Sequence, residues 1–129
     1  MVDDSMIKIL CLVGLGGFIG SIARYLTTVA MTKSFPSIFP YGTFLANVIG
    51  CFIIGVVYGL SERLSGFTPA WRFFLATGFC GGYTTFSSFA YENMTFLKGP
   101  DYGTFALYTL GSLSTGLLAV WGGMMLSKI

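Results

Sequence analysis

The chain has 129 residues, of which 54% are hydrophobic and only 9% are charged, and its mean hydropathy is +0.79. Soluble domains carry about 25% charged residues, so this composition excludes an ordinary soluble protein and indicates lipid as the natural solvent. The net charge of +2 is too small and too scattered to indicate a nucleic-acid partner. The absence of histidine and of any CxxC spacing excludes a zinc site and a disulfide framework.

Four segments are long and apolar enough to cross a membrane. A hydrocarbon core about 30 Å thick requires about 20 mostly apolar residues of helix. The predicted spans cover residues 7–31, 42–60, 70–97 and 102–126. The short segments between them carry proline, glycine or charge. We therefore predict an all-α membrane protein, with residues 1–129 forming one transmembrane domain of four helices.

The distribution of lysines and arginines does not predict a preferred orientation of the chain in the membrane. Four spans place both termini on one side, where four lysines or arginines fall, and three fall toward the other side. The two groups are Lys8, Arg63, Arg72 and Lys128, and Arg24, Lys33 and Lys98. This near tie predicts a dual-topology protein whose simplest assembly is an antiparallel homodimer. The alternative is a single orientation fixed by a partner or by one dominant charge.

The third span contains an unusual run. Residues 77–89 read Thr-Gly-Phe-Cys-Gly-Gly-Tyr-Thr-Thr-Phe-Ser-Ser-Phe near the middle of the segment. Each glycine costs about 1 kcal/mol of helix relative to alanine, and the following residues are β-branched or aromatic. We expect the helix to break at Gly81-Gly82 and the adjacent residues, at mid-membrane depth. The opened carbonyls then hold a cation, or Thr and Ser hydroxyls satisfy a simple kink; the residues support both equally.

Aromatic and hydroxyl side chains follow the break. Phe86 and Phe89 are three residues apart, so they share a helical face. Spacing alone favours ordinary packing, but the positive ring edges can also attract an anion.

Uncharged hydrogen-bonding groups occur in the other spans as well. Asn47 lies one turn after Thr43, while Tyr108, Ser112 and Thr115 have helical spacing. Such donors predict either a track that replaces the water around a small anion or hydrogen bonds that hold helices together. Asn47 is the strongest candidate, because an amide in lipid needs partners for its donors and its acceptor.

Three charged residues lie in or near the spans: Arg24, Arg72 and Glu92. Arg24 either concentrates anions at an entrance or snorkels to the headgroups, and snorkelling is the better interpretation of Arg72. Glu92, about a turn from the end of its span, either closes a hydrogen-bond network or reaches water.

These residues resemble the Fluc or CrcB family of fluoride channels. The similarity covers essentially the whole chain and includes Gly-Ser-Ile-Ala-Arg-Tyr at 20–25, Gly-Thr-Phe-Leu-Ala-Asn at 42–47 and the run from Gly78 to Phe89. It implies a dual-topology antiparallel dimer with two fluoride pores and a central structural Na⁺, in a bacterial plasma (inner) membrane.

The resemblance also implies roles for individual residues. Phe86 and Phe89 would bind fluoride with their ring edges, and Asn47 would be a pore donor. The backbone carbonyls of Gly81 and Thr84 would hold Na⁺. The remaining implied residues are Arg24 in the vestibule and Thr43, Ser88, Tyr108 and Ser112 along the polar track. Gly116 departs from the family pattern, since some members have a hydroxyl residue at that position.

Two other classes remain as alternatives. A small four-helix, proton-coupled exporter of cationic drugs needs a carboxylate deep in the membrane, whereas the first span has none and Glu92 lies near a span end. A non-transporting assembly would explain the glycines but not the cluster of Asn, Thr and Phe. An enzyme is disfavoured, because no nucleophile has a base beside it.

Overall fold

The structure is a computed structural model that describes residues 2–129, and within this range it is helical with no strand. Met1, which the predicted domain includes, lies outside the described residues. The elements are α1 (Asp4–Ser34), α2 (Tyr41–Arg63), α3 (Pro69–Arg72), the π-helical segment η1 (Phe73–Cys80), α4 (Gly81–Tyr83), α5 (Phe86–Lys98) and α6 (Tyr102–Leu126). The all-α prediction is confirmed.

Three helices are long and apolar enough to cross a membrane: α1, α2 and α6. They contain the predicted spans 7–31, 42–60 and 102–126. Two of them begin at aspartates that accept a backbone hydrogen bond: Asp3 Oδ1 from Met6 N at 2.8 Å and Asp101 Oδ1 from Thr104 N at 3.1 Å. The chain is a multi-pass membrane protein by the length and composition of these helices.

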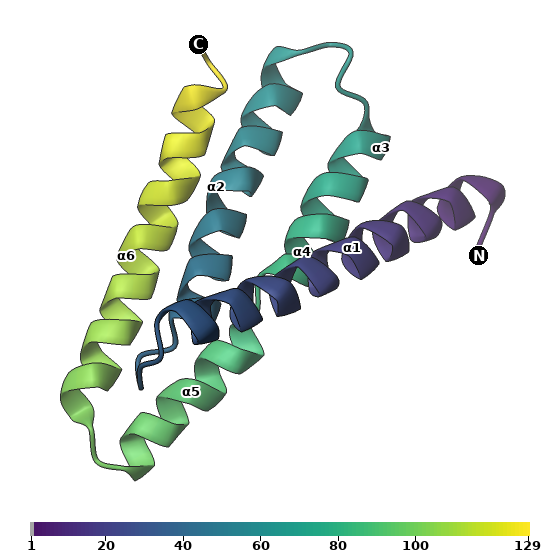
Figure 1. Ribbon diagram of the computed structural model, residues 1–129. Helices are drawn as coiled ribbons and strands as arrows, with labels where there is room; N and C mark the ends of the chain where they lie inside the picture. The colour runs from purple at the N-terminus through teal and green to yellow at the C-terminus, as the bar shows by residue number, and fades with distance from the viewer. Residues whose placement is uncertain (1) are drawn as a thin grey trace.

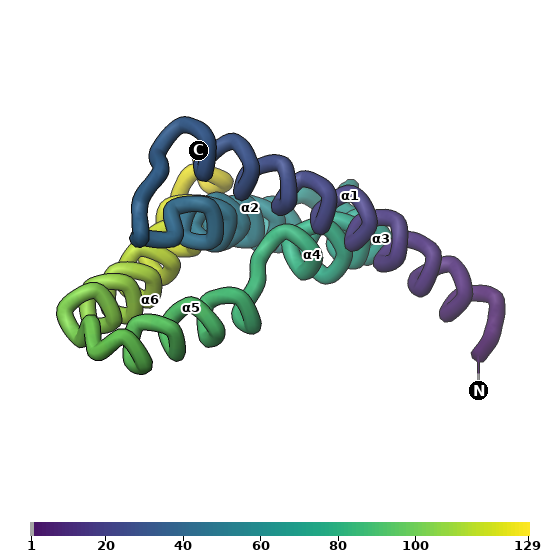
Figure 2. Tube along the Cα trace, turned by 60° about the horizontal axis from the view of Figure 1, so that its bottom comes forward, coloured from purple at the N-terminus to yellow at the C-terminus, as the bar shows by residue number. Residues whose placement is uncertain are grey.

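The third predicted span, 70–97, corresponds to the series α3, η1, α4 and α5. Gly81 and Gly82 themselves are helical, and the two extended residues are Thr84 (φ −87°, ψ 157°) and Thr85 (φ −148°, ψ 114°). The interruption therefore lies two residues beyond the glycine pair. Figures 1 and 2 show α4 and α5 joined by this short stretch, with α5 leaving in a new direction.

Glycines set how closely the helices approach. A Cβ added at Gly16 or Gly20 of α1 would collide with the backbone of Phe79, and one added at Gly123 of α6 would collide with Phe52 of α2. At these positions the helix backbones are in close contact, which only a residue without a side chain permits. No such contact occurs at Gly14, Gly111 and Gly122, where an added Cβ meets nothing within 4 Å of the described chain. As Figure 1 shows, α2 and α6 run side by side, while α1 crosses η1 and α4.

Candidate functional site

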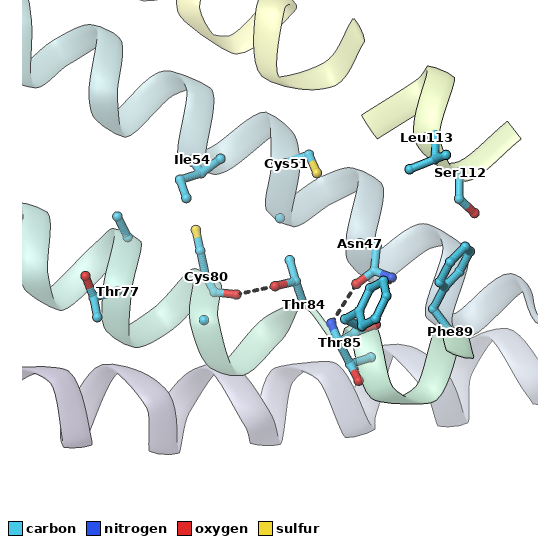
Figure 3. Close-up of a pocket in the computed structure, with 14 residues that line it drawn as sticks. Asn47, Cys51, Ile54, Thr77, Cys80, Thr84, Thr85, Phe89, Ser112 and Leu113 are labelled. Atoms are coloured by element: carbon cyan, nitrogen blue, oxygen red, sulfur yellow. Dashed lines mark hydrogen bonds between the residues drawn. The ribbon is translucent and has the colours of Figure 1, made fainter. Parts of the chain in front are cut away.

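The amide of Asn47 binds the backbone at the interruption. Its Oδ1 accepts a hydrogen bond from the N–H of Thr85 at 2.7 Å, and its Nδ2 donates to the carbonyl of Thr85 at 3.1 Å. Asn47 thus satisfies both backbone groups of a residue that is buried outside a helix, which an apolar side chain would leave unpaired. One N–H of the amide remains for another acceptor. Figure 3 shows Asn47 above the break.

The same hydrogen bonds free two carbonyls. In a continuous helix, the N–H of Thr85 would bond the carbonyl of Gly81, and the N–H of Ser88 would bond that of Thr84. Here Thr85 donates to Asn47, while Ser88 N donates to Thr85 Oγ1 at 3.1 Å and so caps α5. The diverted carbonyls belong to the two residues whose oxygens the family resemblance assigns to Na⁺.

These carbonyls fit a hard monovalent cation. Both residues line one cavity whose walls contain no charged side chain. Gly81 is exposed, and an added Cβ there would meet nothing within 4 Å, so its surroundings in one chain are open. The hydroxyl of Thr84 donates to the Cys80 carbonyl at 2.9 Å, so it has only lone pairs left for a ligand. The segment therefore presents backbone carbonyls and one hydroxyl oxygen to a cation.

Phe86 and Phe89 lie on the first turns of α5. Their ring centroids are 5.9 Å apart with an interplanar angle of 41°. Phe89 is half-buried and lies 5.0 Å from the ring of Tyr108. Phe86 is 80% exposed within one chain, although its ring contacts that of Phe89. A phenyl ring so exposed beside a polar break is available to an ion or to a second chain.

A cavity of about 410 Å³ joins these groups. Asn47, Phe86, Phe89 and Ser112 line it together with Gly81 and Thr84. The Ser112 hydroxyl is buried and has no hydrogen-bond partner in the described chain. Figure 3 shows Phe89 and Ser112 on the same side of the break as Asn47. The cavity thus combines amide and hydroxyl donors with aromatic rings, which can solvate a small anion without a fixed charge.

Thr43 and Tyr108 converge on Glu92 instead of standing free along a track. Thr43 Oγ1 donates to Glu92 Oε2 at 2.8 Å, and Tyr108 Oη donates to Glu92 Oε1 at 2.8 Å. Three helices, α2, α5 and α6, meet in this network. One feature of the sequence points to such a network. Glu92 is a carboxylate within a hydrophobic span, and a carboxylate there needs hydrogen-bond donors from neighbouring helices.

Two further predicted residues have defined partners. Arg24 Nε donates to the carbonyl of Gly82 at 2.9 Å, so its guanidinium contacts α4 beside the break. Ser88 contributes its backbone N–H to the cap of α5. Asn93 was not singled out from the sequence; it is 6% exposed and its Oδ1 has no partner in residues 2–129.

Fold and site together define a polytopic helical membrane protein with an uncharged, mostly apolar cavity that contains a few hydrogen-bonding groups at a helix interruption. The chain belongs to the CrcB-like family (CrcB-like protein, Camphor Resistance), whose model matches residues 11–124. The resemblance inferred from the motifs is confirmed.

Individual relatives match over nearly their whole length. A protein of Gloeothece citriformis is 51% identical over 123 residues, which cover 95% of this chain and 98% of the relative. A protein of Flavobacterium psychrophilum is 42% identical over 121 residues, with 94% and 98% covered. A third, from Chlorobium phaeobacteroides, is 47% identical over 121 residues, with 93% of each chain covered. All three are named fluoride-specific ion channel FluC.

Proposed function

We propose that this chain is a fluoride-specific ion channel, not an enzyme, through which F⁻ leaves the cell passively. The observation that carries the proposal is the cavity at the helix interruption, where Asn47, Phe86, Phe89 and Ser112 converge without any charged lining residue. A small anion loses much hydration energy on entering a membrane, and neutral donors replace it without holding the ion as tightly as a buried cation would. Family membership supports the same function.

The conducting unit is an antiparallel homodimer with two pores. Phe86 is 80% exposed and the outer side of Gly81 is open, so a second chain completes the cavity. The near tie of lysines and arginines favours both insertion orientations, and chains of opposite orientation pair about a two-fold axis. In this arrangement the interruption at Thr84 and Thr85 lies near the middle of the bacterial inner membrane.

The carbonyls of Gly81 and Thr84 from each chain hold one structural Na⁺ at the dimer axis. When bound, the ion supplies positive charge that compensates the carbonyl dipoles of the two opened helices. Asn47 and the hydroxyl of Thr85 hold these carbonyls out of the helical hydrogen-bond pattern. Sodium therefore stabilises the dimer and does not travel with fluoride.

The drug exporter is not favoured. Its proton carrier would have to be Glu92, whose two oxygens accept hydrogen bonds from Thr43 and Tyr108. The family relatives are named as ion channels.

The test is fluoride efflux from liposomes that contain the purified protein, followed with a fluoride electrode. Wild type should release fluoride rapidly and retain chloride, and Phe86→Ala should release neither. The control is Phe18→Ala on α1, because Phe18 is a similarly exposed phenylalanine (64%) that does not line the cavity. No fluoride release from a folded wild-type dimer would overturn the proposal, as would full release by Phe86→Ala.

The dimer architecture has its own test. Reporter fusions at Ile129 should label both sides of the membrane in the same cells if both orientations form. Labelling of one side alone would exclude the antiparallel dimer while leaving the fluoride measurement unaffected.

A further inference from the structure

A groove opens where α1 separates from the start of the third span. The two segments cross in close contact at Gly16, where an added Cβ would collide with the carbonyl of Phe74. Figures 1 and 2 show α1 leading away from α3 on the N-terminal side of this crossing. The space between them has a volume of about 220 Å³ and is lined by Leu12, Ala70, Trp71 and Phe74. These residues are distinct from those that line the cavity at the helix interruption.

The lining of the groove suits a hydrocarbon chain. Its described side chains are aliphatic or aromatic, and the rings of Trp71 and Phe74 meet edge to face with centroids 6.3 Å apart. Walls of this kind give a polar ligand no hydrogen-bond partner. Trp71 is exposed at the beginning of the predicted span 70–97, and tryptophan is enriched at the membrane–water interface. The groove therefore extends from headgroup depth into the acyl-chain region.

Two basic residues lie at the headgroup end of the groove. Lys8 is exposed and lies one turn before Leu12, so the two share a face of α1. Arg72 directly follows Trp71 at the end of α3. The other two arginines of the chain donate to backbone carbonyls, whereas Lys8 and Arg72 have no hydrogen-bond partner within residues 2–129. Their cationic groups are therefore available to an anion at the membrane surface.

We propose that this groove binds an acyl chain of one anionic phospholipid, whose phosphate contacts Lys8 and Arg72. Basic side chains at a membrane surface attract anionic headgroups, and both cationic groups donate hydrogen bonds to phosphate. A zwitterionic lipid offers the same acyl chains but carries a cation of its own, so it gains less from these side chains. Binding does not require that the protein conduct fluoride. In the proposed antiparallel dimer, one groove opens toward each leaflet.

The two tryptophans of the chain provide a matched test. Trp71 is 55% exposed, and Trp121 on α6 is 60% exposed but does not line the groove. Brominated acyl chains quench tryptophan fluorescence on contact. Trp121→Phe leaves Trp71 as the reporter of the groove, and Trp71→Phe leaves Trp121 as the reporter of ordinary lipid contact. Each variant is reconstituted into phosphatidylcholine vesicles with increasing fractions of brominated phosphatidylglycerol or brominated phosphatidylcholine.

The quenching curves give the binding preference for phosphatidylglycerol over phosphatidylcholine at each reporter. The preference should be several-fold at Trp71 and absent at Trp121. Lys8→Gln and Arg72→Gln, each combined with Trp121→Phe, should lower the preference at Trp71, because each removes one cation from the headgroup site. Lys128→Gln is the matched control, since Lys128 is exposed and falls on the same side of the membrane as Lys8 but outside the groove.

Three results would overturn the proposal. Equal preferences at the two tryptophans would mean that lipid contact at the groove is nonspecific. A preference at Trp71 that persists in both Lys8→Gln and Arg72→Gln would remove the assigned headgroup contacts. No quenching of Trp71 by either lipid would mean that a second chain covers the groove. Fluoride efflux is measured separately, so failure of the proposed channel function would leave the quenching result unchanged.

Discussion

The α2–α6 pair and the α4–α5 junction show two different ways of joining segments within a membrane protein. Along α2 and α6 the contact is backbone against backbone, at Gly55 beside Val120 and at Gly123 beside Phe52. At the junction the backbone is opened, and Asn47 and the Thr85 hydroxyl replace the helical hydrogen bonds. The helix pair needs small residues, whereas the junction needs polar side chains in defined positions.

This difference separates stability from function. Because lipid is as apolar as leucine, helices associate through close packing, and the glycines of α2 and α6 provide it. The junction loses helical hydrogen bonds, because extended residues occupy the middle of a hydrophobic segment. In return it has free carbonyls and a mostly apolar cavity with a few hydrogen-bonding groups. Variants of the first region should change stability alone, and variants of the second should change both stability and transport.

The largest effect is expected at Asn47. Asn47→Leu leaves the N–H and the carbonyl of Thr85 unpaired in a buried position, and each unpaired group costs about 1–3 kcal/mol. Fluoride efflux from liposomes should be abolished, and the midpoint of thermal unfolding should fall.

Asn47→Asp and Ser114→Ala sharpen this prediction. The aspartate keeps an acceptor for Thr85 N but places a negative charge in the cavity, so it should restore part of the stability and none of the flux. Ser114 is exposed on α6 and serves as the neutral control. Wild-type flux in Asn47→Leu would contradict the role assigned to the junction.

The helix pair is tested by two adjacent glycines of α6. Gly123→Ala places a methyl group against the backbone of α2, with Val56 N at 2.8 Å, and such overpacking typically costs about 1–3 kcal/mol. Gly122→Ala meets nothing within 4 Å and should keep or raise the unfolding midpoint. Equal losses of stability in the two variants, measured by thermal unfolding in the same detergent, would contradict this assignment of the α2–α6 contact.

The sequence predicted some regions better than others. Regions held by interactions between residues close in the sequence were predicted well, and regions held by interactions between distant residues were not. The ends of α1, α2 and α6 lie within a few residues of the predicted spans, because segment length and hydropathy are local signals. The interruption was expected at Gly81-Gly82 and the adjacent residues, and the extended residues are Thr84 and Thr85, at the far end of that stretch. Its position depends on Asn47, which is distant in the sequence.

The same reasoning explains the candidate site. Asn47, Phe86, Phe89 and Ser112 were each selected from the sequence, and the fold brings them to one cavity. That Thr43 and Tyr108 would both donate to Glu92 could not be predicted, since this network joins three helices whose relative rotation no local pattern specifies. Periodicity predicts which residues share one face of a helix. It does not predict which faces of two neighbouring helices pack together.

A smaller effect is expected from the cap of α5. Thr85→Val removes the oxygen that accepts from Ser88 N, and loss of such a cap costs about 1 kcal/mol. Ser88 N is then free to bond the Thr84 carbonyl, so stabilisation of the dimer by Na⁺ should weaken. Thr84→Val is the isosteric control, since the Cys80 carbonyl that loses its hydroxyl partner still accepts from Thr84 N at 2.9 Å. Thermal unfolding with and without Na⁺ measures both effects; a larger loss in Thr84→Val would contradict the cap.

The smallest effect is expected where α1 meets α4. Tyr83 Oη and Thr27 Oγ1 are 2.9 Å apart, and Thr27 also donates to the Ala23 carbonyl at 2.9 Å. Tyr83→Phe therefore leaves no donor unpaired and keeps the ring stacked on Phe79, so it should cost about 0.6 kcal/mol, as an average interhelical hydrogen bond does. Thr27→Val should cost more, because it strands a phenol hydroxyl on a side chain only 5% exposed. If instead Tyr83→Phe lowered the unfolding midpoint as much as Gly123→Ala, one hydrogen bond between α1 and α4 would contribute as much to stability as the close glycine packing between α2 and α6.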